Sequence, residues 1–95
     1  MNDCEPNCER ERTDRLNFGM ALTVLKRGGK VARAGWNGKG IFIQLQRPDA
    51  NSKMTHPYIY IDTTGLQTDN PSAPKNLVPW LASQTDMLSE DWMIV

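Results

Sequence analysis

The stretch NFGMALTVLKRGGK, residues 17–30, predicts the clearest helix of the chain. Its apolar residues recur at i, i+3, i+4 and i+7, the spacing of one helix face: Phe18, Ala21, Leu22 and Leu25. Asn17 suits the start, because its side-chain oxygen can accept a hydrogen bond from an otherwise unpaired amide. Gly28 and Gly29 end the helix, because glycine takes the left-handed cap conformation without a steric penalty.

Four segments after this helix have the composition of short strands. Ile41–Gln46 and Tyr58–Asp62 alternate between two faces, as half-buried strands do. The chain also has strand character from Val31, and Trp92–Val95 predicts a final buried strand. Pro79 is expected to hold the residue before it extended.

The C-terminal part also predicts a second helix. Ser83 stands three residues before Asp86, the spacing of a capping box, so a short helix is expected over 84–89. The chain therefore predicts an α+β fold, a small antiparallel sheet with one longer and one short helix, in a single domain. Residues 17–95 form this domain, and the charged residues 1–16 are expected to be a mobile N-terminal extension.

Length and charge exclude several classes of protein. The 95 residues carry 11 basic and 11 acidic side chains, which gives no general electrostatic attraction for duplex nucleic acid. There is no apolar run near the roughly 18 residues of a membrane span, and no signal peptide, so a cytosolic protein is expected.

Metal-binding and catalytic groups are scarce. Cys4 and Cys8 are interpreted as ordinary thiols, with a local disulfide as the alternative, because a zinc site needs more ligands than His56 could add. His56 is the only histidine, and an exposed loop position is its simplest interpretation. Asp86 and Glu90 would share a helix face, either as an acid pair or, more commonly, as solvated charges. No catalytic residue, metal or cofactor is predicted.

Residues suited to ligand binding gather in ARAGWNGKG, residues 32–40. Trp36 offers a flat surface for stacking, and the glycines let the main chain approach a ligand closely. Arg33 and Lys39 carry charge that suits a phosphate. Other side chains could complete a pocket: Asn37, Phe42, Gln44, Gln46, Tyr58, Tyr60, Trp80, Ser83, Gln84 and Thr85. The opposing interpretation is that the aromatics form the core and that Asn37-Gly38 is a hairpin turn.

Three segments resemble a family of small proteins common in phages and prophages: NFGMALTVLKRGGK, VARAGWNGKGIFI and LVPWLASQTDMLSEDWMIV. The family pattern reads F-x-x-A-L-x-x-L-K-x-G, V-A-R-x-G-W-N-G-K and V-P-W-x-A-S-Q-T-D-L-L-x-x-D-W. Met87 departs from it where leucine is usual, a mild packing change. The resemblance covers most of residues 17–95, with a weakly patterned middle over about 47–76.

This family includes the anti-Thoeris phage proteins of the second type. The resemblance implies a sponge that sequesters the cyclic ADP-ribose isomer made by the Thoeris bacterial defence, without cutting it. It also implies a homo-tetramer with ligand pockets between subunits, in the cytoplasm of the infected bacterial host. Some members hold cyclic oligonucleotides of other defence systems at a separate site, so cyclic di- or trinucleotides are a second expected ligand class.

The resemblance suggests roles for the residues of the glycine-rich stretch. Trp36 would stack on a base or form the pocket wall. Asn37 and the amides of Gly38 and Lys39 would hold phosphate or ribose, and Arg33 would balance the pyrophosphate.

A second group of expected ligand contacts lies near the short helix. Gln84, Thr85 and Asp86 would bind ribose hydroxyls or adenine edges, and Phe42 and Trp80 are lesser candidates. Loop cations could form a further anionic site, although solvated charges are the commoner explanation: Arg47, Lys53 and Lys75.

Two alternatives remain open at this point. An enzyme that degrades the same kind of nucleotide would use Asp86, Glu90 and His56. A phage interaction module without a small ligand would use Trp36 and Trp80 only as core or subunit contacts.

Overall fold

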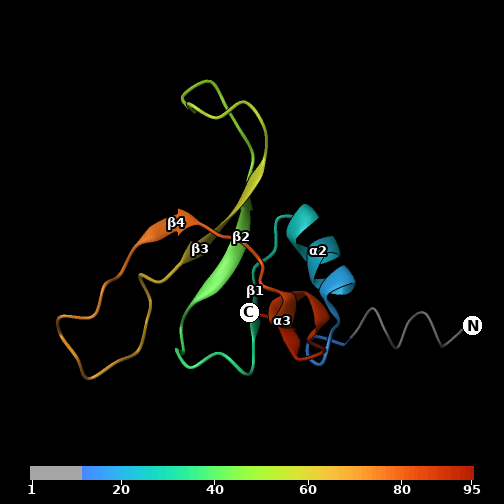
Figure 1. Ribbon diagram of the computed structural model, residues 1–95. Helices are drawn as coiled ribbons and strands as arrows, with labels where there is room; N and C mark the ends of the chain where they lie inside the picture. The colour runs from blue at the N-terminus through green and yellow to red at the C-terminus, as the bar shows by residue number, and fades with distance from the viewer. Residues whose placement is uncertain (1–11) are drawn as a thin grey trace, which may run out of the picture.

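The computed structural model describes residues 12–95, so Cys4 and Cys8 lie outside the described part of the chain. Five antiparallel strands form one sheet in the order β4-β3-β2-β1-β5, with two helices packed beside it (Figure 1). The elements in chain order are α2 Phe18–Lys26, β1 Val31–Arg33, β2 Phe42–Gln46, β3 Tyr58–Asp62, β4 Leu77–Pro79, α3 Gln84–Leu88 and β5 Trp92–Ile94. The predicted α+β fold is confirmed.

Both helices begin at the caps that the sequence predicts. The Asn17 side chain accepts a hydrogen bond from the Met20 amide (2.9 Å) at the start of α2. Ser83 and Asp86 form a reciprocal capping box at the start of α3. Gly28 follows the last residues of α2 with a φ of 93°. Local capping chemistry therefore determines where these helices begin and where α2 ends.

The core is a small cluster with members from most of the packed elements. Its buried residues are Leu16, Ala21, Leu25, Val31, Ile43 and Trp92. The predicted final strand over 92–95 is confirmed as β5, but only Trp92 in it is fully buried, because Ile94 and Val95 are 39% and 54% exposed. β5 is the last strand of the sheet, and its residue Trp92 contacts α2 through Phe18 and α3 through Asp86.

A segment that precedes α2 covers the outer edge of β5. Leu16 exchanges two backbone hydrogen bonds with Trp92 (2.9 and 3.1 Å), and the Ile94 amide donates to the Thr13 carbonyl (2.7 Å). The packed domain therefore begins before residue 17, where the sequence placed its boundary. This pairing also occupies hydrogen-bonding groups of β5 that could otherwise pair with another chain.

The connection between β1 and β2 is a broad loop over residues 34–41, and the predicted Asn37-Gly38 hairpin turn is wrong. Such a turn needs positive φ at both central residues, and neither of these two has it. The chain leaves β1 through an earlier turn, in which the Trp36 amide donates to the Arg33 carbonyl (3.2 Å). Farther on, the Lys39 carbonyl accepts from the Gln67 amide (2.9 Å), which ties the loop to the β3–β4 connection.

Replacement of Gly40 by alanine is expected to destabilise this loop contact strongly. Gly40 has a φ of 86°, and a Cβ there would overlap the carbonyl oxygen of Gly65. Gly28→Ala is a matched control, because Gly28 has a similar φ of 93° with nothing within 4 Å of the added Cβ. We expect Gly28→Ala to lower the free energy of unfolding by about 1 kcal/mol through backbone strain, and Gly40→Ala by roughly 3 kcal/mol. Urea unfolding measures both, and equal losses would contradict the prediction.

Candidate functional site

Three tryptophans meet where loop 34–41, the end of β4 and the start of β5 converge. The ring centroids of Trp36 and Trp92 lie 5.4 Å apart at an interplanar angle of 80°, and those of Trp80 and Trp92 lie 6.1 Å apart at 87°. Aromatic rings favour this edge-to-face arrangement. Trp92 is fully buried, whereas Trp36 and Trp80 each keep part of their surface exposed. The cluster therefore joins the core to the surface.

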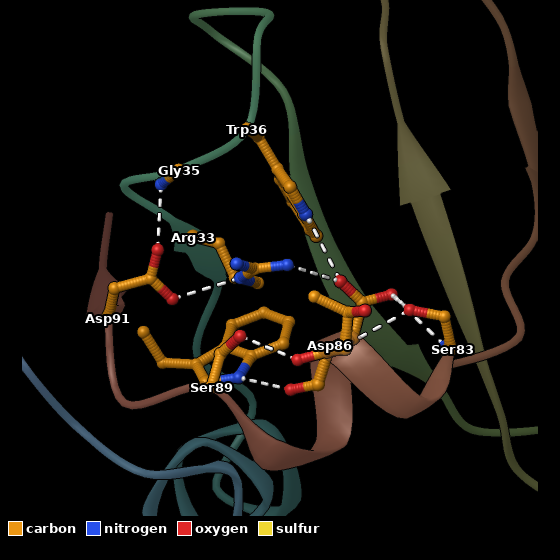
Figure 2. Close-up of polar contacts among 9 residues, drawn as sticks. Arg33, Gly35, Trp36, Ser83, Asp86, Ser89 and Asp91 are labelled. Atoms are coloured by element: carbon orange, nitrogen blue, oxygen red, sulfur yellow. Dashed lines mark hydrogen bonds and ion pairs between the residues drawn. The ribbon is translucent and has the colours of Figure 1, made fainter.

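Asp86 connects the start of α3 to this cluster (Figure 2). One carboxylate oxygen accepts from the Arg33 guanidinium (2.9 Å) and, more weakly, from the indole Nε1 of Trp36 (3.4 Å). The other oxygen accepts from the amide (3.1 Å) and the hydroxyl (2.9 Å) of Ser83. The Asp86 carboxylate therefore has protein donors at both oxygens.

Asp91 holds the opposite side of Arg33. Its Oδ1 accepts from Arg33 Nε (2.9 Å), and its Oδ2 accepts from the Gly35 amide (2.8 Å) (Figure 2). The Arg33 side chain is only 15% exposed. The hydrogen bond to Asp91 raises the pKa of Arg33, so the guanidinium stays charged. Arg33 thus forms ion pairs with two carboxylates of its own chain, those of Asp86 and Asp91.

The structure divides the predicted binding residues into two groups. One group lies around the tryptophan cluster and the start of α3: Arg33, Trp36, Trp80, Gln84, Thr85 and Asp86. The other lines an open pocket of about 220 Å³, to which Lys30, Met93 and also Arg33 contribute: Gly38, Lys39 and Phe42. Phe42 points away from the cluster because it alternates with the buried Ile43 along β2. Asn37 is exposed on the loop that joins the two groups.

A family model for the Thoeris anti-defense 2-like domain matches residues 16–95. The chain belongs to the Thoeris anti-defense 2-like family. It is also similar to a protein named Thoeris anti-defense 2 from Bacillus phage SP01, with 40% identity over 85 residues. That alignment covers 85% of this chain and 96% of the relative. The resemblance drawn from the three sequence segments is confirmed.

Sequence reasoning missed two residues near the sites of this Thoeris anti-defense 2-like domain. Asp91 was assigned no role, because Arg33 lies 58 positions away along the chain and no local spacing links them. Lys30 was assigned no role, and its ammonium nitrogen lies 4.9 Å from the centre of the Phe42 ring. Asp91 directly precedes the buried Trp92, which pairs with Arg33 across β1 and β5, and this register is visible only in the fold.

The acidic residues of the domain are not arranged as a helix-face pair. α3 ends at Leu88, so Glu90 is not on the helix, and it is exposed, while Asp86 contacts Arg33. The prediction that Asp86 and Glu90 share a helix face is therefore wrong. His56 is exposed in the β2–β3 connection. Within residues 12–95, no three His, Cys, Asp or Glu side chains are grouped as metal ligands, and none of the helices could span a bilayer.

Acid is expected to destabilise the fold through Asp86 and Asp91. The hydrogen bond from Arg33 lowers the pKa of Asp91. Burial raises the pKa of Asp86, but hydrogen bonds from Ser83 and Arg33 outweigh it, so this pKa is also lowered. In an unfolded chain, the pKa of an aspartate is about 3.9. The contribution of these two carboxylates to the free energy of unfolding should therefore be constant above about pH 5. It should be lost as the pH drops toward their lowered pKa values in the folded state.

Urea midpoints between pH 2 and pH 7 measure this dependence. The Asp91→Asn variant has one titrating carboxylate fewer, so its midpoint should fall less steeply in acid than that of the wild type. Parallel curves for the two proteins would contradict the assignment.

Proposed function

We propose that this protein counters the Thoeris defence by binding its nucleotide signal, a cyclic ADP-ribose isomer, and holding it without cleavage in the cytoplasm of the infected host. Family membership supports the anti-Thoeris role. The observation that carries the binding proposal is the state of Trp36: its indole is oriented by Asp86 and by two other tryptophans, yet part of it is exposed. An oriented, accessible aromatic ring is suited to stacking on a nucleobase.

Trp36 alone does not account for tight binding. Nanomolar affinity corresponds to about 12 kcal/mol, whereas one aromatic stack contributes about 1–3 kcal/mol. We assign the phosphate or ribose contacts to Asn37, Lys39 and the amides of the loop, because charge-assisted hydrogen bonds are the strong ones. Gln84 and Thr85, both exposed on the first turn of α3, are assigned to ribose hydroxyls or adenine edges. Asp86 and Asp91 both pair with Arg33, so the assigned role of Arg33 and Asp86 is to hold the site in shape.

The ligand is proposed to be enclosed between copies of the chain, in a homo-tetramer. The pocket that Lys39 and Phe42 line measures about 220 Å³ and is open, whereas sites for ligands of this size usually enclose about 300–1,000 Å³. Large apolar side chains near α3 are also exposed, with Leu81 at 91% and Leu88 at 77%. A second copy on this surface would bury those leucines and add walls to the site.

A thermal-shift panel combined with the solution mass tests this proposal. The panel contains cyclic ADP-ribose isomers, cyclic di- and trinucleotides, and linear ADP-ribose as a control. A ligand at 100 times its Kd stabilises the bound state by about 2.7 kcal/mol, which should raise the melting temperature by roughly 10 °C. The mass should be four times the 10.7 kDa of one chain. No shift with any nucleotide would refute the binding proposal and favour an interaction module.

A further inference from the structure

Asp91 anchors three consecutive residues just before Trp36. Its carboxylate accepts from Arg33 Nε (2.9 Å) and from the Gly35 amide (2.8 Å), and its backbone carbonyl accepts from the Ala34 amide (3.0 Å). Figure 2 shows the Asp91 carboxylate reaching Gly35 with one oxygen and Arg33 with the other. One residue at the start of β5 thus fixes the path of the chain as it leaves β1.

Gly35 makes this close approach possible. A Cβ atom at residue 35 would lie 2.9 Å from Asp91 Oδ2 and 3.3 Å from Arg33 Nη2. Separations below 3 Å between a Cβ and another heavy atom are too short, so any side chain at this position would push the carboxylate away. The position of the Asp91 carboxylate therefore depends on the absence of a side chain at residue 35.

The hydrogen bond from the Trp36 indole to Asp86, which also orients Trp36, is weak. Its Nε1 lies 3.4 Å from Asp86, which is long for a hydrogen bond. The turn before Trp36 is closed by the bond from the Trp36 amide to the Arg33 carbonyl (3.2 Å). Without the Asp91 carboxylate, the Gly35 amide loses its acceptor and Arg33 keeps only its contact with Asp86. The base of loop 34–41 would then be free to shift relative to the cluster.

We infer that Asp91, together with Gly35, is a positioning residue for the nucleotide site: it does not touch the ligand but fixes the loop that presents Trp36. This inference rests on the proposed function. Affinity depends on such placement, because a binding group that is displaced by about 1 Å no longer matches its ligand.

The test compares Asp91→Ala and Asp91→Asn with Asp49→Ala as a matched control. The Asp49 carboxylate also holds a turn, by accepting from the Asn51 amide (2.9 Å), but in the β2–β3 connection. Calorimetric Kd values for the cyclic ADP-ribose isomer, measured well below the melting temperature, should rise about tenfold or more in Asp91→Ala and about threefold in Asp91→Asn. Asp49→Ala should stay within about twofold of the wild type.

A second readout follows the loop itself. Amide NMR spectra should show displaced or broadened signals for the Gly35 amide and the Trp36 indole in Asp91→Ala, with neither signal moved in Asp49→Ala. A purely stabilising role would lower the melting temperature of the Asp91 variants and leave their Kd unchanged, and that result would overturn the inference. Should Asp91→Ala fail to fold, Asp91→Asn decides by the same two measurements.

The two proposals can fail separately. Wild-type protein that binds no nucleotide in the panel refutes the proposed function, and Asp91 then positions no ligand site. Wild-type protein that binds, with Asp91 variants that bind equally well, refutes this inference alone.

Discussion

The Trp36→Ala variant is expected to remain folded and to lose most of its affinity for the nucleotide. Removal of one stacking surface should weaken binding by about 1–3 kcal/mol, which is about 5- to 150-fold in Kd. The domain should survive because Trp36 is half-buried and its loop keeps its contacts with Asp91 and Gln67. Isothermal calorimetry gives the Kd, and circular dichroism gives the melting temperature.

Trp36→Phe is the matched control for this prediction. Phenylalanine keeps a flat ring but loses the indole N–H that reaches Asp86. Its Kd should therefore lie between those of the wild type and Trp36→Ala. If Trp36→Ala binds as tightly as the wild type, the ring is only a core or subunit contact.

The Trp92→Ala variant is expected to lose cooperative unfolding altogether. Trp92 has no exposed surface, and its ring packs against those of Phe18, Trp36 and Trp80. Truncation of a buried tryptophan costs about 3–5 kcal/mol, a large part of the roughly 5–15 kcal/mol that stabilises a typical small domain. The change also removes the indole donor (3.0 Å) to the Asp86 carbonyl. Thermal and urea melts followed by circular dichroism measure this effect.

Trp80→Ala is the comparison for Trp92→Ala, because Trp80 belongs to the same cluster but is only half-buried. Its melt should remain cooperative, with a smaller loss of stability. Similar melts for the two variants would show that the cluster, and not Trp92 in particular, supports the core.

Local signals explain which parts of the fold could be predicted. Asn17 and the Ser83–Asp86 pair act on amides within three residues, so their spacing identifies both helix starts. The alternation in β2 and β3 is equally local. The Asn37-Gly38 turn was mispredicted because β1 and β2 pair only at Val31 and Ile43, so no tight hairpin is formed.

The sequence predicted which residues belong to the candidate site better than it predicted how they are arranged in space. Arg33, Trp36 and Asp86 were all named, and the structure brings them into contact. Lys39 and Phe42 were expected beside them but line a neighbouring pocket, to which only Arg33 of these three residues also contributes. Strand alternation turns Phe42 away from the buried Ile43, and only the tertiary contacts of the tryptophans show where the cluster lies. Contacts between distant segments, such as that of Arg33 with Asp91, require the fold.

The central claim is that the protein sequesters its ligand and does not consume it. The direct test mixes the protein with the cyclic ADP-ribose isomer, removes the protein by filtration, and heats the retained complex. We predict that the filtrate is depleted in proportion to the protein and that heating returns ligand of unchanged mass. A filtrate with undiminished ligand, or ligand of altered mass produced over many turnovers, would contradict the account.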